Sequence, residues 1–137
     1  MPTAVPRIRT EVQIMFFDTD CGGVVSNIAY LRFIEIARTL LVEELGLALA
    51  EMAETQRYPV VVHTEIDYRH AAKLGDQLVV EGWLDHPEHV RLWCAFRIIR
   101  TKDNMLIAEC RQSLALIEMP AGKLLCFPES WKKYRNS

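Results

Sequence analysis

Apolar and polar positions alternate with a period of two near the start of the chain, and the period changes after about residue 27. Over residues 9–17 the period places Val12, Ile14 and Phe16 on one face, which predicts a β-strand. Residues 28–45 instead form an apolar helical pattern with one narrow polar stripe, made of Arg32, Glu35, Thr39 and Glu43. A helix that is apolar around so much of its circumference is expected to be buried on several sides.

Alternation returns after a possible short helix over residues 47–56. From Tyr58 onward one strand face is predicted to carry Val60, Val62, Ile66 and Tyr68, and the other His63, Glu65 and Asp67. Further strands are predicted over 77–85, 90–101 and 105–118, and a terminal helix over 129–134. Because the connections are short, we expect the last four strands to pair antiparallel in a meander. One helix and one curved sheet that wraps around it make a two-layer α+β domain.

The composition fits one globular domain over residues 1–137, with 50% hydrophobic and 25% charged residues. The net charge of -2 gives no reason to expect nucleic acid or an anionic membrane surface as a partner. The sequence has no apolar run long enough to span a bilayer, and residues 1–6 lack the apolar core of a signal peptide. We therefore expect a cytoplasmic protein that does not insert into membranes.

The four cysteines are far apart and form no Cys-x-x-Cys pair, so free thiols are expected rather than disulfides. Cys94 and Cys110 fall within strand patterns and are expected in the core, whereas Cys21 lies in a loop. His86 and His89 share a turn, but two ligands do not make a zinc site. The sequence thus predicts neither a metal site nor a cofactor.

Two tryptophans bear on assembly. Trp83 and Trp93 are each next to a large aliphatic residue in their strands. Because neighbouring side chains of a strand point to opposite faces, the two tryptophans are predicted on the outer face of the sheet. Exposed tryptophans on such a face often mark a contact surface, so this face is a candidate interface between subunits. The alternative is that a loop or the C-terminal segment covers them.

The strongest chemical signal is the loop over residues 18–25 (DTDCGGVV), which leads directly into the long helix. The first N–H groups of a helix have no intrahelical acceptor, and negative charge is favoured beside them. A carboxylate next to such donors can attack a polarised carbonyl or activate water against it. The alternative is a simple turn with an Asp near a helix cap.

Residues 18–25, Tyr30 and residues 33–38 (FIEIAR) resemble the hotdog-fold acyl-CoA thioesterases, in particular the 4-hydroxybenzoyl-CoA thioesterase-like branch with the Tol-Pal-associated enzymes. Residues 66–76 and 127–129 extend the similarity over nearly the whole chain. The resemblance implies a five-stranded antiparallel sheet around one long helix and hydrolysis of a thioester. It also implies a homodimer joined through strand edges, often doubled to a homotetramer. Coenzyme A is then part of the substrate, and no cofactor is implied.

Carried over to this sequence, the resemblance implies that Asp20 is the catalytic carboxylate, acting as nucleophile or as general base. It implies that the backbone N–H of Asn27 polarises the thioester carbonyl, and that Gly23 lets the loop pass close to the substrate. Glu35 matches a family glutamate and is the alternative base. Its position three residues before Arg38 on the polar stripe favours an ion-paired surface role.

Other contacts with substrate are expected around the loop, from Val24, Val25, Tyr30, Arg69, His70 and Lys73. The three basic residues could meet the phosphates of coenzyme A, with a solvated turn as the alternative. Tyr30 points into the apolar arc of the helix, which favours a place in the core, and Asp18 is expected to hold the loop through hydrogen bonds. The Tol-Pal-associated enzymes commonly carry Tyr-His after the two valines, whereas Ser26 and Asn27 stand here.

Three functions remain open at this stage. The first is an acyl-CoA thioesterase for small aromatic or short-chain acyl groups. The second is a hotdog dehydratase or hydratase, which generally relies on a catalytic His that the loop lacks. The third is a non-catalytic acyl-CoA-binding protein. The motif does not specify the acyl group, since an apolar pocket discriminates by only ~1–3 kcal/mol per methylene.

Overall fold

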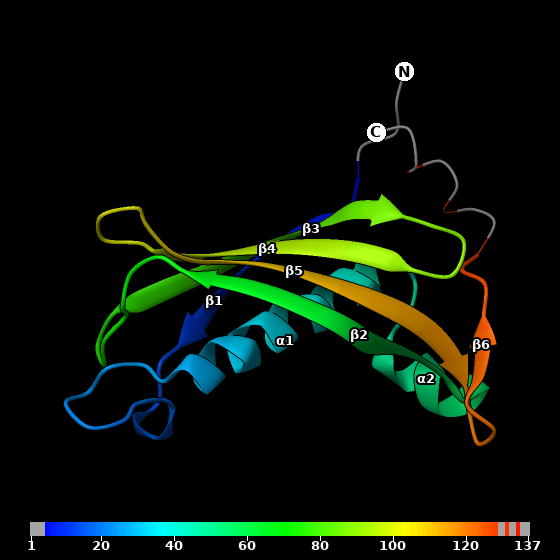
Figure 1. Cartoon of the computed structure of the whole chain (residues 1–137), viewed down its shortest axis with the longest axis horizontal. Coiled ribbons are helices and arrows are strands. Elements are labelled where there is room, and N and C mark those ends of the chain that lie inside the picture. The colour runs from blue at the N-terminus through cyan, green and yellow to red at the C-terminus, as the bar shows by residue number, and fades with distance from the viewer. Residues whose placement is uncertain (1–4, 129–130, 132–133, 135–137) are drawn as a thin grey trace.

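A computed structural model describes residues 5–128, 131 and 134. A curved antiparallel sheet lies across a long helix, and the two form the layers of an α+β domain (Figure 1). The strands are β1 (Arg7–Gln13), β2 (Arg57–Tyr68), β3 (Gln77–Pro87), β4 (Leu92–Arg100), β5 (Met105–Glu118) and β6 (Lys123–Leu125). The helices are η1 (Phe16–Asp18, one 3-10 turn), α1 (Asn27–Glu44) and α2 (Leu49–Thr55).

The first predicted strand was too long. It ends at Gln13, and the chain then turns through η1, so that Val12 and Ile14 are buried while Phe16 is exposed. The turn forms because the Asp18 carboxylate accepts the Met15 N–H, and the Met15 carbonyl accepts the Asp18 N–H. A local side-chain partner thus replaces the sheet partner that a longer strand would need.

The helix predictions are closer. α1 matches the predicted 28–45 within one residue at each end, and Ser26 caps it by accepting the Ala29 N–H. α2 lies inside the predicted 47–56. The predicted terminal helix over 129–134 falls largely outside the described residues. The short strand β6, which pairs with β5, was not predicted.

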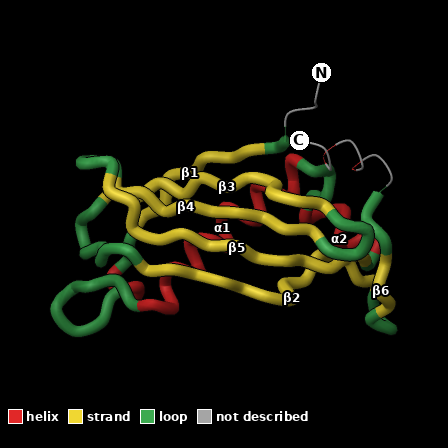
Figure 2. Tube along the Cα trace, turned by 45° about the horizontal axis from the view of Figure 1, so that its top comes forward, coloured by secondary structure: helices red, strands yellow, loops and turns green. Residues whose placement is uncertain are grey.

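The predicted meander is wrong for β2. The sheet order is β1-β3-β4-β5-β2, so β3, β4 and β5 form a meander, while β2 lies at the far edge against β5 (Figure 2). A loop over residues 69–76 carries the chain from that edge back to β3. The pairing of β2 with β5 runs from Arg57 to Tyr68 and is the longest in the sheet, and connection length alone could not reveal it.

A bulge in β2 changes which side chains share a face. The register shifts between Val61 and His63, so Val62 is an extra residue opposite β5. Val60 therefore lies on the same face as His63, not on the face of Ile66 as the alternation predicted. From His63 to Tyr68, beyond the bulge, the side chains lie on the two faces as the alternation predicted.

The core lies between α1 and the inner face of the sheet. Its α1 side is formed by Tyr30, Phe33, Ile34, Ala37, Leu41 and Val42, all of them buried. α1 is not buried on all of its apolar sides, however. Ile28 is 79% exposed, and Leu31, Ile36 and Leu40 are also exposed. One chain therefore leaves several apolar side chains of α1 uncovered, and two of them, Ile28 and Leu31, lie at its start, where Tyr68 at the end of β2 contacts Asn27.

Candidate active site

The loop between η1 and α1 is a tight turn that presents Asp20. The Asp20 N–H donates to the Val24 carbonyl at 2.9 Å, and the Gly23 N–H donates to the Asp20 carbonyl at 3.1 Å. Gly23 has a φ of +74°, a conformation that favours glycine, and this is its role in the turn. Asp20 is exposed, and its carboxylate makes no hydrogen bond or ion pair with any described residue. It is therefore available to a ligand.

Asp18 holds the other side of this turn. Its side chain is only 3% exposed, and it forms an ion pair with Arg32 of α1 in which the Nε donates at 2.9 Å. Burial alone would raise the pKa of Asp18, but the hydrogen bonds from Arg32 and from the Met15 N–H bring the pKa below its ordinary value. Asp18 thus carries a buried charge that fixes the loop, which is the role expected for it.

The loop over residues 69–76 lies against the Asp20 turn. The Val25 N–H donates to the Ala72 carbonyl at 2.9 Å, and the Leu74 N–H donates to the Gly23 carbonyl at 2.8 Å. The Ala72 N–H in turn donates to the Tyr30 hydroxyl at 3.1 Å. Burial raises the pKa of Tyr30, which keeps it a neutral hydrogen-bonding group. Two loops that are far apart in sequence therefore meet at the start of α1.

A hollow of about 240 Å³ lies at this meeting point. It is lined by Val24, Val25, Asn27, Tyr30, Tyr68, Arg69, His70 and Ala71. Six of these were candidates from the sequence, and the fold brings them together. Gly23 and Lys73 lie beside it, since Val24 and Lys73 form a β-bridge, whereas Asp20 and Glu35 are not among the lining residues.

Sequence reasoning missed Tyr68 as a site residue. It ends β2, and its hydroxyl donates to the Asn27 carbonyl at 3.2 Å, at the first residue of α1. Its ring also lies 5.5 Å from that of Tyr30. Its position in the sequence could have identified it, because Tyr68 ends a predicted strand and is followed directly by the basic residues Arg69 and His70.

The three basic candidates differ in their availability. Arg69 forms ion pairs with Glu109 at 3.0 Å and with Asp67 at 3.9 Å. The His70 Nδ1 is 3.0 Å from the Leu106 carbonyl oxygen, to which it donates. The ammonium of Lys73 makes no ion pair with any described residue. Among these residues, Lys73 is thus the positive charge most accessible to an anionic ligand.

Glu35 lies eight residues into α1, about 12 Å from its start. Its side chain is 66% exposed and pairs with Arg38 at 3.6 Å. Arg38 also donates to the Gln112 side-chain oxygen at 2.9 Å, so the pair belongs to a polar link between α1 and β5. These contacts favour the structural interpretation of Glu35.

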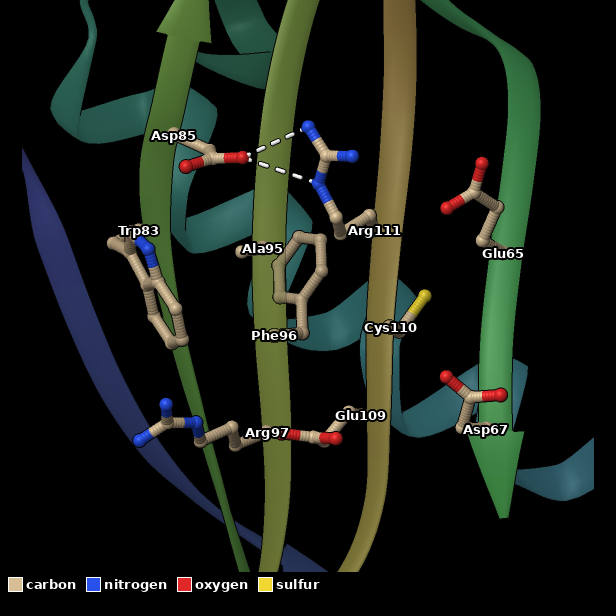
Figure 3. A pocket seen from close by; sticks show the side chains of 10 residues that line it. All are labelled: Glu65, Asp67, Trp83, Asp85, Ala95, Phe96, Arg97, Glu109, Cys110 and Arg111. Carbon is tan, nitrogen blue, oxygen red and sulfur yellow. Dashed lines mark hydrogen bonds and ion pairs between the residues drawn. The ribbon is translucent and has the colours of Figure 1, made fainter.

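A second hollow, of about 300 Å³, lies on the outer face of the sheet, away from the loop (Figure 3). Asp85 and Arg111 form an ion pair at 3.0 Å across its upper part, and the Trp83 ring stands at its side. The Arg111 guanidinium lies 4.6 Å from the centre of the Trp93 ring. Both tryptophans face outward, as predicted, but arginines cover part of each ring.

Among the described residues, no three His, Cys, Asp or Glu side chains gather closely enough to hold a metal ion. Within the same residues, no helix has the length and apolar character needed to cross a membrane. The cytoplasmic location stays a prediction from sequence.

The curved sheet wrapped on one long helix, with a carboxylate turn at the start of that helix, defines a hotdog-fold protein. The family model of the thioesterase-like superfamily matches residues 15–133, so the chain belongs to that superfamily. This confirms the fold and the family resemblance predicted from the sequence.

Individual relatives agree with this membership. The chain is 32% identical over 122 residues to acyl-CoA thioesterase YbgC of Haemophilus influenzae, which is 88% of each protein. It is 30% identical over 123 residues to acyl-CoA thioester hydrolase YbgC of Escherichia coli, covering 89% of this chain and 90% of that one. The crystal structure of Slr0204, a 1,4-dihydroxy-2-naphthoyl-CoA thioesterase from Synechocystis, superposes with a TM-score of 0.81. At 24% identity over 93% of this chain and 94% of Slr0204, that likeness shows the fold.

Proposed function

We propose that this chain is an acyl-CoA thioesterase that hydrolyses small aromatic or short-chain acyl-CoA to the free acid and coenzyme A. One observation carries the assignment of the site. The exposed Asp20 carboxylate sits in a turn that hydrogen bonds hold on both sides, and the Asp20 N–H is bonded to Val24, which lines the hollow at the start of α1. The two YbgC relatives, which are acyl-CoA thioesterases, support the reaction class.

The proposed reaction uses the start of α1 as an oxyanion site. The thioester carbonyl oxygen accepts the Asn27 N–H, which as the first residue of the helix has no intrahelical acceptor. Asp20 then either attacks the carbonyl carbon or takes a proton from a water that attacks it. The C–S bond breaks, and coenzyme A leaves as the thiolate, which takes up the proton released from water. If Asp20 is the nucleophile, water then cleaves the acyl–Asp20 anhydride and regenerates the carboxylate. In both routes water supplies the oxygen of the acid.

The segment after β2 is the proposed binding site for the phosphates of coenzyme A. Lys73 has a free ammonium next to the Asp20 turn, and Arg69 borders the hollow with one face exposed. His70 lines the hollow, but its ring is already hydrogen-bonded to the Leu106 carbonyl. Lys73 should therefore contribute more to phosphate binding than Arg69, whose charge is shared with two acids.

We further propose that the site is completed in a homodimer joined through the β2 edge. β2 pairs only with β5, and its other edge is open in one chain. Val61 and Val62 on this strand are exposed, as are Ile28 and Leu31 on α1. Pairing of two β2 strands would cover these side chains and close the hollow, which one chain leaves open. The outer face with Trp83 and Trp93 is the proposed contact between dimers in a homotetramer.

The test is the release of coenzyme A thiol from a panel of aromatic and aliphatic acyl-CoA thioesters. Asp20→Asn keeps the shape of the side chain and removes its charge, so kcat should fall by roughly a hundredfold or more. Glu51→Gln, which removes one exposed carboxylate on α2, is the matched control and should leave kcat unchanged. Glu35→Gln should cost less than Asp20→Asn.

Near-wild-type turnover by Asp20→Asn would remove Asp20 from the chemistry, and loss of turnover in Glu35→Gln alone would move the base to α1. If the protein binds acyl-CoA without releasing thiol, it is a binding protein. If it instead adds or removes water on the acyl chain, it is a hydratase or dehydratase.

A further inference from the structure

Cys126 and His89 form a thiol–imidazole pair outside the proposed active site. The Cys126 Sγ lies 3.1 Å from the His89 Nε2, and both residues are exposed. Cys126 directly follows β6, and His89 lies in the turn between β3 and β4. A thiol within hydrogen-bond reach of an imidazole is the arrangement that activates cysteine as a nucleophile.

The backbone fixes this pairing. The Phe127 N–H donates to the His89 carbonyl at 3.2 Å, which holds the segment after β6 against the turn. Phe127 is buried and stacks on Trp131, with ring centres 5.1 Å apart, so the segment is anchored on the core next to Cys126. Figure 1 shows this segment beside the β3–β4 connection, at the end of the sheet opposite the Asp20 loop.

The other cysteines lack this combination of access and partner. Cys94 and Cys110 are buried, and burial raises the pKa of each thiol to about 12, which keeps them protonated and inert. Cys21 is exposed, but its sulfur forms no hydrogen bond with a His among the described residues. It therefore provides an internal comparison for an exposed thiol without an imidazole.

We propose that Cys126 is a modification site that exchanges with small disulfides, with His89 as its base. The His89 Nε2 takes the proton of the thiol, and the Cys126 sulfur attacks one sulfur of the disulfide. The S–S bond of the small molecule breaks, its second sulfur leaves with the electron pair and takes the proton from His89. The products are a mixed disulfide on Cys126 and one small thiol, so the cysteine is oxidised as the small disulfide is reduced.

The experiment measures the rate at which the full chain reacts with 5,5′-dithiobis(2-nitrobenzoate), from the absorbance of the thiolate released. Cys21→Ser leaves Cys126 as the exposed thiol of the described chain, and Cys126→Ser leaves Cys21. At neutral pH the Cys21→Ser protein should react at least about tenfold faster than the Cys126→Ser protein. Mass spectrometry of the product locates the adduct.

His89→Asn in the Cys21→Ser background tests the base. The rate should fall about tenfold at neutral pH and recover near pH 9.5, where thiols ionise without help. If His89→Asn merely loosened the segment, Cys126 would become more accessible and react faster. An unchanged or faster rate in His89→Asn, or equal rates for the two single serine variants, overturns the proposal.

Discussion

Two aspartates that are two residues apart have opposite environments. Asp18 is buried and holds Arg32 and the Met15 N–H, while the carboxylate of Asp20 is exposed and free of partners among the described residues. The sequence indicated different roles for them, with Asp18 holding the loop, but it did not predict their difference in burial. The difference arises because the 3-10 turn directs Asp18 inward, toward a guanidinium that α1 supplies from one turn inside its start. Asp18 therefore shapes the loop, and the exposed Asp20 stays the proposed catalytic carboxylate.

Asp18 should make stability depend on pH. Its pKa is lower in the folded chain than in the unfolded one, so its contribution is complete above about pH 4 and is lost as the pH falls through the folded-state pKa. Asp18→Asn should lower the free energy of unfolding at pH 7 by about 1–3 kcal/mol, toward the lower end because Arg32 is partly exposed. Urea unfolding at several pH values measures this.

The difference between wild type and Asp18→Asn should shrink below about pH 4, where the wild-type carboxylate also becomes protonated. Asp103→Asn is the matched control, because Asp103 also pairs with an arginine, Arg100, but at an exposed site. Asp103→Asn should lower the free energy of unfolding by less than Asp18→Asn does. A difference for Asp18→Asn that stays constant down to pH 2 would show that the buried charge is not its cause.

At the scale of elements, α1 packs on the inner face of the sheet, chiefly against β3 and β1. Gly82 of β3 lies opposite Phe96 of β4, and the Phe96 ring fills the space that a side chain at position 82 would take. The missing side chain at position 82 thus leaves room for the buried Phe96 ring in the core between the sheet and α1. The alternation of the sequence predicted both strands but gave no sign of this contact.

Gly82→Ala should therefore destabilise the fold. Its Cβ would meet ring carbons of Phe96 at 2.8 and 2.9 Å, and Phe96 is fully buried and has no room to move. Overpacking of this kind costs about 1–3 kcal/mol, which thermal unfolding would report as a lower midpoint. Phe96→Leu in the same chain should recover part of the loss. Strictly additive effects of the two substitutions would contradict a direct clash.

At the scale of the whole molecule, one chain leaves two surfaces that a second copy could cover. The first combines the open edge of β2 with the exposed Ile28 and Leu31 at the start of α1, and it borders the candidate site. The second is the outer face of the sheet, where Trp83 and Trp93 stand among paired arginines and acids. The first is more apolar and adjoins the loop, so it is the better candidate for an interface that builds the site.

Activity should accordingly depend on assembly. Val62→Asp places like charges beside each other where two β2 edges would meet, so it should both dissociate the dimer and lower kcat/KM by at least about tenfold. Trp93→Glu should remove only the tetramer and leave an active dimer. Light scattering at the assay concentration measures both. A fully active monomer of 15.8 kDa would contradict a shared site.

The sequence by itself determined the local elements, the hotdog class and the loop that leads into α1. Periodicity and capping act over a few residues, so α1, the β3–β5 meander and the outward phase of the tryptophans could be read directly. Only the tertiary structure decided the place of β2, the bulge at Val62 and the burial of Asp18 rather than Asp20. These depend on pairing and packing between residues far apart in the chain, whose free energies no local pattern encodes.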